Sequence, residues 1–179
     1  MGVVVATPCG CKTRPTSRIR LESPEKAHAA IAAAAREGDH LRVFAMLDRK
    51  TRWSVMSCYR DKRSTYRLVS AHYPEARRAA ELRRVARAQK AADAPSYFAA
   101  LARGEKLLDA LKTAPARAKR AGSGASRVEL VAGGQRFAYC REVEGWAFCG
   151  LRERLSKMQL RAARDLVSVR ESAETYRRE

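Results

Sequence analysis

The sequence contains no apolar run long enough to cross a membrane. A helix that spans a bilayer needs about 18 to 20 consecutive apolar residues, and no stretch of the 179 residues approaches this length. Acidic residues are also few, since 19 Asp and Glu face 37 Lys and Arg and leave a formal net charge of +18. The hydrophobic content of 46% is nevertheless sufficient for one compact domain. The composition thus excludes a membrane-spanning helix and a wholly disordered chain.

The local motifs of catalytic and nucleotide-binding sites are missing as well. There is no Gly-rich dinucleotide fingerprint, and the segment Gly104-Glu-Lys106 lacks the leading glycine and the final Ser or Thr of a phosphate-binding loop. Ser123 is not preceded by the strand that a nucleophile elbow requires. Cys58 has no recognisable base near it in the sequence, and His28, like the other two histidines, is expected to be exposed or half-buried. We therefore expect a non-enzymatic protein and name no catalytic residue.

The spacing of the cysteines also argues against a metal site. Cys9 and Cys11 form a single C-x-C pair, no C-x-x-C pair is present, and the histidines are scattered. Zinc sites normally combine two ligand pairs at short spacing. We expect neither a metal nor a cofactor.

Helical periodicity runs through the first two thirds of the chain. Ser23, Pro24 and Glu25 provide an N-cap, a first-turn proline and an acidic residue at the positive end of the helix dipole, so a helix is predicted to begin here and to end at Gly38-Asp39. The sequence predicts further helices over residues 40–47, 51–73, 75–92 and 95–111, and a long one from about residue 151. Residues 112–126 are basic and lack an apolar pattern, which predicts a mobile linker.

Between residues 127 and 149 the apolar period changes from 3.6 to 2, which predicts strands. Two-residue turns at Gly133-Gly134 and Glu144-Gly145 give a three-stranded antiparallel meander. The residues expected to face each other are Leu130 with Phe137, Val128 with Tyr139, and Val143 with Trp146. The predicted fold class is therefore α+β, with several N-terminal helices packed on the meander and a long C-terminal helix after it.

The same register places Cys140 directly opposite Cys149. Counting outward from a turn at Glu144-Gly145 makes them a non-hydrogen-bonded pair, whose Cα atoms lie about 4.5 Å apart, within the range of about 4.4 to 6.8 Å that a disulfide spans. Two interpretations fit this pair, a disulfide or two small buried residues on a packed face. The redox state of the compartment decides between them.

The N-terminus differs from the rest of the chain and is predicted to be a tether. Residues 1–11 are small and apolar and residues 12–21 are polar and basic. The tether is predicted over residues 1–23, ahead of a single domain over residues 24–179. The small apolar residues before Gly10-Cys11 resemble the end of a bacterial lipoprotein signal, which implies lipidation of Cys11, or of Cys9, in the cell envelope. The short apolar stretch is expected if such a signal begins upstream of Met1. The alternative is the frayed N-terminus of a cytoplasmic protein.

Arginines crowd two of the predicted helices. The helix over residues 51–73 carries a stripe of tyrosines from Tyr59 to Tyr73, with Trp53 and Met56 on its flank. The candidate residues for binding polyanions or lipid headgroups are Arg60, Arg63, Arg67, Arg77, Arg78, Arg83, Arg84 and Arg87. Arginine beside tyrosine suits phosphate contacts and base stacking, but tyrosines at this spacing are also typical of a helix core surrounded by solvated arginines. On a tethered protein the same charge would meet a membrane surface or anionic envelope polymers.

A second resemblance covers residues 24–50 and 127–150. The runs Arg36-Glu-Gly-Asp39 and Phe44-Ala-Met-Leu-Asp48, ahead of a strand with Gly145-Trp146, are similar to those of small bacterial proteins with the nuclear-transport-factor-2-like cone fold. The three predicted strands and the long C-terminal helix depart from that pattern, so no functional residue is carried over. The resemblance implies either an envelope lipoprotein or a domain that binds a small ligand inside the cone.

These observations favour a membrane-tethered, non-enzymatic envelope lipoprotein with a structural or binding role. The alternative is a cytoplasmic nucleic-acid-binding protein that uses the Arg and Tyr surface. An enzyme with a cone-shaped pocket stays open, without named residues.

Overall fold

A computed structural model describes residues 21–124 and 126–178, and in that part of the chain seven helices accompany one four-stranded antiparallel sheet. The helices are α1 (Pro24–Glu37), α2 (His40–Ala45), α3 (Arg49–His72), α4 (Glu75–Lys90), α5 (Ala94–Gly104), α6 (Asp109–Thr113) and α7 (Arg152–Tyr176). The strands are β1 (Lys119–Ser123), β2 (Arg127–Ala132), β3 (Gln135–Glu142) and β4 (Gly145–Phe148), which lie in the sheet in chain order. The predicted α+β class is confirmed.

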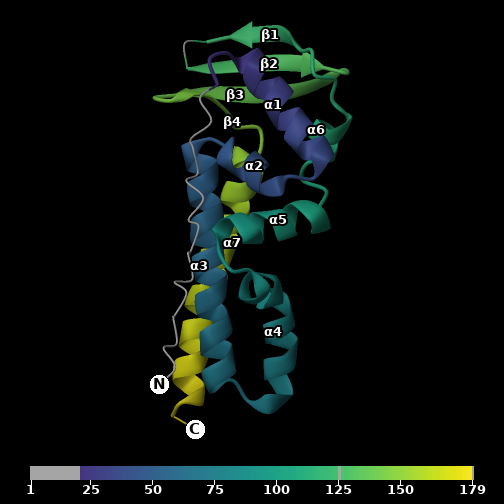
Figure 1. Ribbon diagram of the computed structural model, residues 1–179. Coiled ribbons are helices and arrows are strands. Elements are labelled where there is room, and N and C mark those ends of the chain that lie inside the picture. The colour runs from purple at the N-terminus through teal and green to yellow at the C-terminus, as the bar shows by residue number, and fades with distance from the viewer. Residues whose placement is uncertain (1–20, 125, 179) are drawn as a thin grey trace, which may run out of the picture.

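The sheet lies at one end of an elongated molecule, with α1 and α6 beside it (Figure 1). The two long helices α3 and α7 extend from the sheet side by side, and α4 runs next to them. They are parallel, because Ser54 contacts Ser156 near their starts at 3.3 Å and His72 contacts Arg177 near their ends at 2.7 Å. The fold therefore has a sheet-containing head and a helical stalk.

The helix α1 begins and ends at the residues that the sequence predicts. Ser23 accepts a hydrogen bond from the backbone N–H of Lys26, and Pro24 occupies the first turn, where its missing N–H costs nothing. Gly38 ends the helix in the left-handed conformation, with φ of 72°. The apolar side of α1, including Ile31, is then buried in the main core.

The first hairpin has the predicted register, with Leu130 opposite Phe137 and Val128 opposite Tyr139. These side chains are buried and form the face of the sheet that belongs to the main core. A smaller apolar cluster lies at the far end of the stalk, where Tyr73, the residue after α3, packs against Tyr176 of α7. The stalk helices are therefore packed at both ends, by the main core near the sheet and by the smaller cluster at the far end.

The predicted mobile linker over residues 112–126 is wrong in its central part. It contains β1, whose Lys119 pairs with Val131 of β2, so the sheet has four strands and not the predicted three. The strand shows no apolar alternation because it is an edge strand held by backbone pairing, and its residues 119–122, of which Lys119 and Arg120 are basic, are exposed. Arg120 of β1 also pairs with Glu25 of α1 at 2.6 Å, and this hydrogen bond lowers the pKa of Glu25 to about 2.

The predicted helix over residues 95–111 is two helices. The first, α5, ends at Gly104, and Lys106 then adopts a left-handed conformation with φ of 52° before α6 begins. The apolar spacing continues across the break because Leu107, Leu108 and Leu111 are all buried. Periodicity alone therefore concealed the interruption.

The predicted second turn is displaced by one residue. Gly145 pairs with Glu142, so Val143 and Glu144 form the turn, and Trp146 lies opposite Arg141 instead of Val143. A Cβ on Gly145 would lie 2.4 Å from the carbonyl oxygen of Leu21, and the glycine has φ of 131°. Gly145 is therefore required inside the strand, next to another stretch of backbone, and not in the turn.

Candidate functional site

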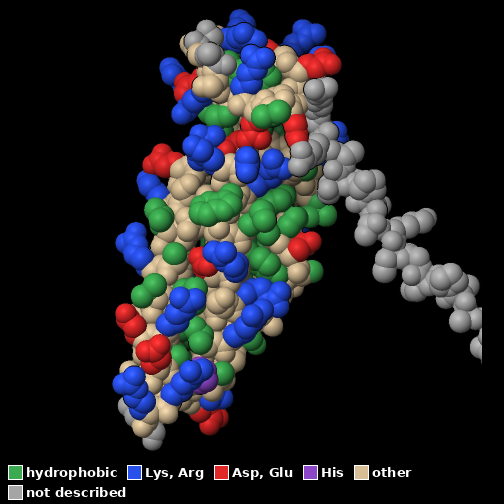
Figure 2. Space-filling view, turned by 90° about the vertical axis from the view of Figure 1, so that its left-hand side faces the viewer, with side chains coloured by type: hydrophobic (Ala, Val, Ile, Leu, Met, Phe, Trp, Pro, Cys, Tyr) green, Lys and Arg blue, Asp and Glu red, His purple; other side chains and the backbone are tan. Residues whose placement is uncertain are grey.

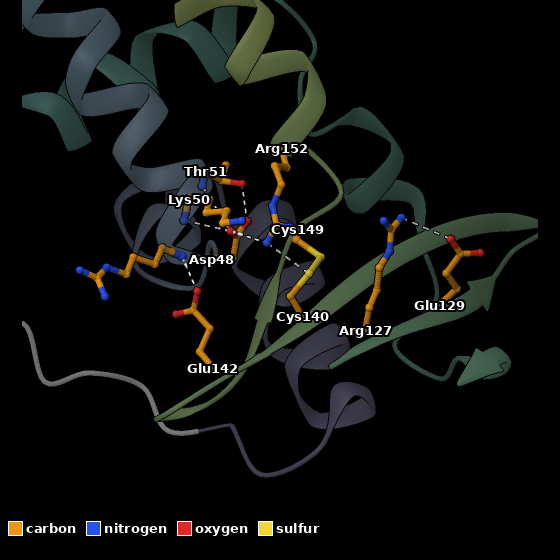
Figure 3. Close-up of a disulfide and its surroundings, with 10 residues drawn as sticks. Asp48, Lys50, Thr51, Arg127, Glu129, Cys140, Glu142, Cys149 and Arg152 are labelled. Carbon is orange, nitrogen blue, oxygen red and sulfur yellow. Dashed lines mark hydrogen bonds and ion pairs between the residues drawn. A yellow bond between two sulfur atoms is a disulfide. The ribbon is translucent and has the colours of Figure 1, made fainter. Parts of the chain in front are cut away.

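A disulfide joins β3 to the residue that follows β4, close to the start of α7 (Figure 3). The structure bonds Cys140 to Cys149, with their Cα atoms 5.9 Å apart. The predicted direct pairing of these residues is wrong, because Cys140 lies opposite Ala147 and Cys149 donates its backbone N–H to Ala138. The bond therefore crosses the two chain segments diagonally, and the displaced turn accounts for the difference.

Asp48 connects the starts of the two stalk helices beside this disulfide (Figure 3). One carboxylate oxygen accepts hydrogen bonds from the backbone N–H groups of Lys50 and Thr51, at 3.0 and 3.3 Å, and so caps α3. The same oxygen lies 2.8 Å from a guanidinium nitrogen of Arg152, the first residue of α7. That nitrogen also lies 3.4 Å from the sulfur of Cys140. Asp48 and Arg152 therefore have a structural role, because their ion pair links the start of α3 to the start of α7.

An apolar hollow of about 850 Å³ lies on the stalk just below the head. We call it the Trp53 face and define it by its lining residues, which are Phe44, Arg49, Lys50, Arg52, Trp53, Ser54, Met56, Ser156 and Gln159. Trp53 is 59% exposed and Met56 54% exposed, which is unusual for side chains of this size. Figure 2 shows hydrophobic side chains gathered on this side of the molecule, with Lys and Arg side chains around them.

Sequence reasoning placed Trp53 and Met56 only on the flank of a helix. The available signal was the presence of two large apolar side chains outside the apolar stripe that begins at Val55. Whether another element covers such a flank depends on the tertiary arrangement. In the described part of the chain none covers it, and the face is open.

The predicted arginine and tyrosine surface does not exist as one surface. Tyr73 is buried, and the hydroxyl of Tyr59 donates to the backbone carbonyl of Ala92 at 3.0 Å. Arg63 donates to the Tyr59 hydroxyl at 2.9 Å, and Arg78 donates to the carbonyl of Tyr73. These two arginines therefore bond within the fold, and the two tyrosines are not platforms for stacked bases.

The remaining predicted arginines separate onto two sides of the stalk. Arg60 and Arg67 are exposed on α3. The arginines on α4 that line hollows between α4 and α7 are Arg77, Arg83, Arg84 and Arg87. None of these arginines lines the hollow of the Trp53 face, whose cations Arg49, Lys50 and Arg52 come from the start of α3.

His28 is fully buried between α1 and the sheet, contrary to the expectation of an exposed or half-buried side chain. Its Nε2 lies 3.0 Å from the carbonyl oxygen of Pro115, which can only accept, so Nε2 carries the proton. Its Nδ1 therefore accepts from the hydroxyl of Tyr139 at 2.8 Å. Burial lowers the pKa of His28 more than the hydrogen bond to Pro115 raises it. The neutral ring is fully bonded and has a structural role.

The free energy of unfolding is expected to fall as the pH drops below 6.5, the ordinary pKa of histidine, because the unfolded chain then binds a proton that buried His28 does not. A glutamine in place of His28 keeps a donor for Pro115 and an acceptor for Tyr139 but does not titrate. Denaturant unfolding of wild type and His28→Gln at about pH 7 and about pH 5 measures the difference. An equal pH slope in both proteins would contradict the prediction, since the other histidines are common to both.

Cys58 is buried in the stalk beside Tyr97, with its sulfur 3.6 Å from the Tyr97 hydroxyl. Burial raises the pKa of the Cys58 thiol, so the reactive thiolate is disfavoured. Among residues 21–124 and 126–178 there is also no cluster of three or more His, Cys, Asp or Glu side chains that could hold a metal.

The proposed lipidation sites Cys9 and Cys11 lie outside the described residues, as does most of the predicted tether over residues 1–23. Within the described part, no helix combines the length and apolar character needed to cross a bilayer. Comparison of the chain with protein-family models, with curated proteins and with solved structures finds no match.

Proposed function

We propose that this protein is a non-enzymatic binding protein that lies on an anionic membrane surface, with the Trp53 face in contact with the lipid. The proposal includes a lipid tether at Cys11, or at Cys9, in a bacterial cell envelope. It also includes the relationship to nuclear-transport-factor-2-like envelope proteins suggested by residues 24–50 and 127–150. The exposed Trp53 face is the observation that carries it.

The chemistry of this face suits the boundary between lipid headgroups and acyl chains. Tryptophan prefers that boundary because its ring is apolar and its N–H is polar. Trp53 and Met56 offer apolar surface, and the cations Arg49, Lys50 and Arg52 line the same hollow. Each cation near an anionic membrane contributes about 1 kcal/mol of attraction. Apolar insertion and charge therefore act at the same place.

A lipid tether and such a face would support each other. One acyl chain alone gives only reversible membrane binding, and a second, electrostatic or apolar, signal stabilises it. The net charge of +18 supplies the electrostatic signal. The disulfide between Cys140 and Cys149 also fits an oxidising compartment such as the bacterial envelope.

Replacing Trp53 by alanine is expected to weaken binding to anionic vesicles by about tenfold, because part of a large apolar side chain no longer leaves water. The measurement is co-sedimentation of the unacylated chain with vesicles of phosphatidylglycerol and phosphatidylcholine. In a Trp146→Phe background Trp53 is the one remaining tryptophan, and its emission should shift to shorter wavelength when vesicles are added.

The matched control is Val143→Ala, which removes another exposed apolar side chain, in the turn between β3 and β4. This variant should bind vesicles as the wild type does. Equal binding by the Trp53 and Val143 variants would refute the proposed contact. Binding that is unaffected by added salt would also contradict it, since the attraction to phosphatidylglycerol is screened by ions.

A further inference from the structure

A groove runs between α4 and α7, with α3 as its floor. It consists of two adjoining hollows of about 490 and 470 Å³, which share Lys62, Arg84, Val85 and Asp165. At one end Arg77 of α4 donates a hydrogen bond to the Tyr176 hydroxyl of α7 at 2.8 Å. At the other end Arg87 pairs with Glu105 at 2.9 Å. Between these contacts the groove is open.

The walls of the groove have the spacing of helix-packing surfaces. The residues of α4 that line it include Ala76, Ala80, Arg83 and Arg87, and those of α7 include Arg161, Asp165, Ser168 and Ser172. Both sets step along the chain by four, three and four residues, which is the spacing of side chains that face a neighbouring helix. Two small residues on each wall would allow a helix backbone to approach closely.

The charges of the groove are not balanced. Each acidic side chain that lines it already pairs with a cation, and the pairs are Lys62 with Asp165, Arg84 with Glu81, and Arg87 with Glu105. Arg83 on one wall and Arg161 on the other are both exposed and form no ion pair within the described residues. Arg77, at one end of the α4 wall, bonds only to the neutral Tyr176 hydroxyl. The groove therefore presents positive charge on both walls that no carboxylate within the described residues compensates.

We propose that this groove binds an acidic amphipathic helix of a partner protein. Its length would be about that of α4, which has 16 residues. Carboxylates on such a helix would face Arg83 and Arg161, and its apolar side would lie against Val85 of α4 and Val169 of α7, which line the hollows. A second copy of this chain fits poorly because its net charge is +18. A flexible polyphosphate chain would leave the regularly spaced small side chains of the two walls without a partner.

The test uses a synthetic, fluorescein-labelled helix of Glu, Ala and Leu, with Leu at the four-three-four spacing and Glu on either side. A peptide of the same composition in scrambled order has the same charge but no apolar face. Fluorescence anisotropy with the full chain should show tighter binding of the amphipathic peptide. The double variant Arg83→Glu/Arg161→Glu should weaken that binding by at least about tenfold.

Two further variants make the result specific to the groove. Arg67→Glu/Arg164→Glu changes the net charge equally at exposed positions that line neither hollow, and should change the affinity less than about threefold. Ser168→Trp leaves the charge unchanged but fills the groove from its exposed wall position, and should block the peptide. Circular dichroism and thermal unfolding establish that each variant is folded.

Equal weakening by the two double variants would overturn the proposal, and so would equal affinity for the two peptides. Tighter binding of an oligothymidine at the same groove would also overturn it, in favour of a nucleic acid. The result is independent of the membrane proposal, because the two double variants carry the same charge and should bind vesicles equally. If the vesicle experiments refute the lipid contact at Trp53, the proposal for the groove is unaffected.

Discussion

Replacing Asp48 by alanine is expected to lower the free energy of unfolding by about 3 kcal/mol, because one substitution removes a helix cap and the anionic partner of a guanidinium. The carboxylate is fully buried and receives backbone N–H groups at the start of α3. The cost is below that of a fully buried ion pair, because the side chain of Arg152 is 36% exposed and its charge can reach water. Denaturant unfolding measures the change.

The matched control for this variant is Asp93→Ala at the start of α5. Asp93 is also an N-cap, with its carboxylate 2.8 Å from the backbone nitrogen of Ser96, but this hydrogen bond is exposed and no cation is paired with it within the described residues. Its loss should cost about 1 kcal/mol, the usual value of a cap. If the two alanine variants lose the same stability, the link between α3 and α7 contributes nothing.

A double-mutant cycle separates the cap from the ion pair. Arg152→Met removes the cation and leaves the hydrogen bonds of Asp48 to Lys50 and Thr51 in place. A coupling energy of about 1 to 2 kcal/mol between the substitutions at Asp48 and Arg152 is expected, because charge-assisted hydrogen bonds are stronger than neutral ones. A coupling near zero would assign the whole effect to the cap.

Features encoded by neighbouring residues were predictable from the sequence. The start of α1 depends on Ser23 and Pro24, and its end on Gly38, all within the helix or next to it. The first hairpin depends on Gly133 and Gly134, which both adopt positive φ, and on the alternation of apolar residues around them. The residues that cause these helix ends and this turn are therefore close to them in the sequence.

Features that depend on distant segments were missed. Gly145 looked like a turn residue, but its lack of a side chain is required by the backbone of Leu21, more than 120 positions away in the chain. The strand β1 was missed because backbone pairing with β2, and not apolar side chains, holds it. The Trp53 face and the groove were missed for a related reason: a helix pattern shows which residues could face a neighbour, but not whether one is there.

Removing the disulfide is expected to lower the free energy of unfolding by about 2.5 kcal/mol, the value that loop-closure entropy gives for a short loop. Cys140 and Cys149 are nine positions apart, so the bond restricts only a small part of the unfolded chain. Loss of the disulfide is also expected to loosen its surroundings, because the bond lies beside Arg152 at the start of α7. Hydrogen exchange of β4 and of the first turn of α7 should therefore accelerate first.

Cys140→Ala/Cys149→Ala and the wild type in reducing buffer should show the same loss of stability. The alanine variant itself should not respond to reductant, because the remaining described cysteine, Cys58, is buried and forms no disulfide. A wild-type protein with the same unfolding midpoint in oxidising and reducing buffer would contradict this account.

The disulfide also provides a test of the compartment. If the protein resides in an oxidising envelope, peptides from the native source, analysed without reduction, should contain Cys140 linked to Cys149. Free thiols at both positions would indicate a reducing environment, because a disulfide of this kind does not persist in the cytosol. The envelope location would then lose the support that the disulfide gives it. The positive surfaces would have to meet anionic partners inside the cell, and the groove between α4 and α7 would remain as the binding site to be tested.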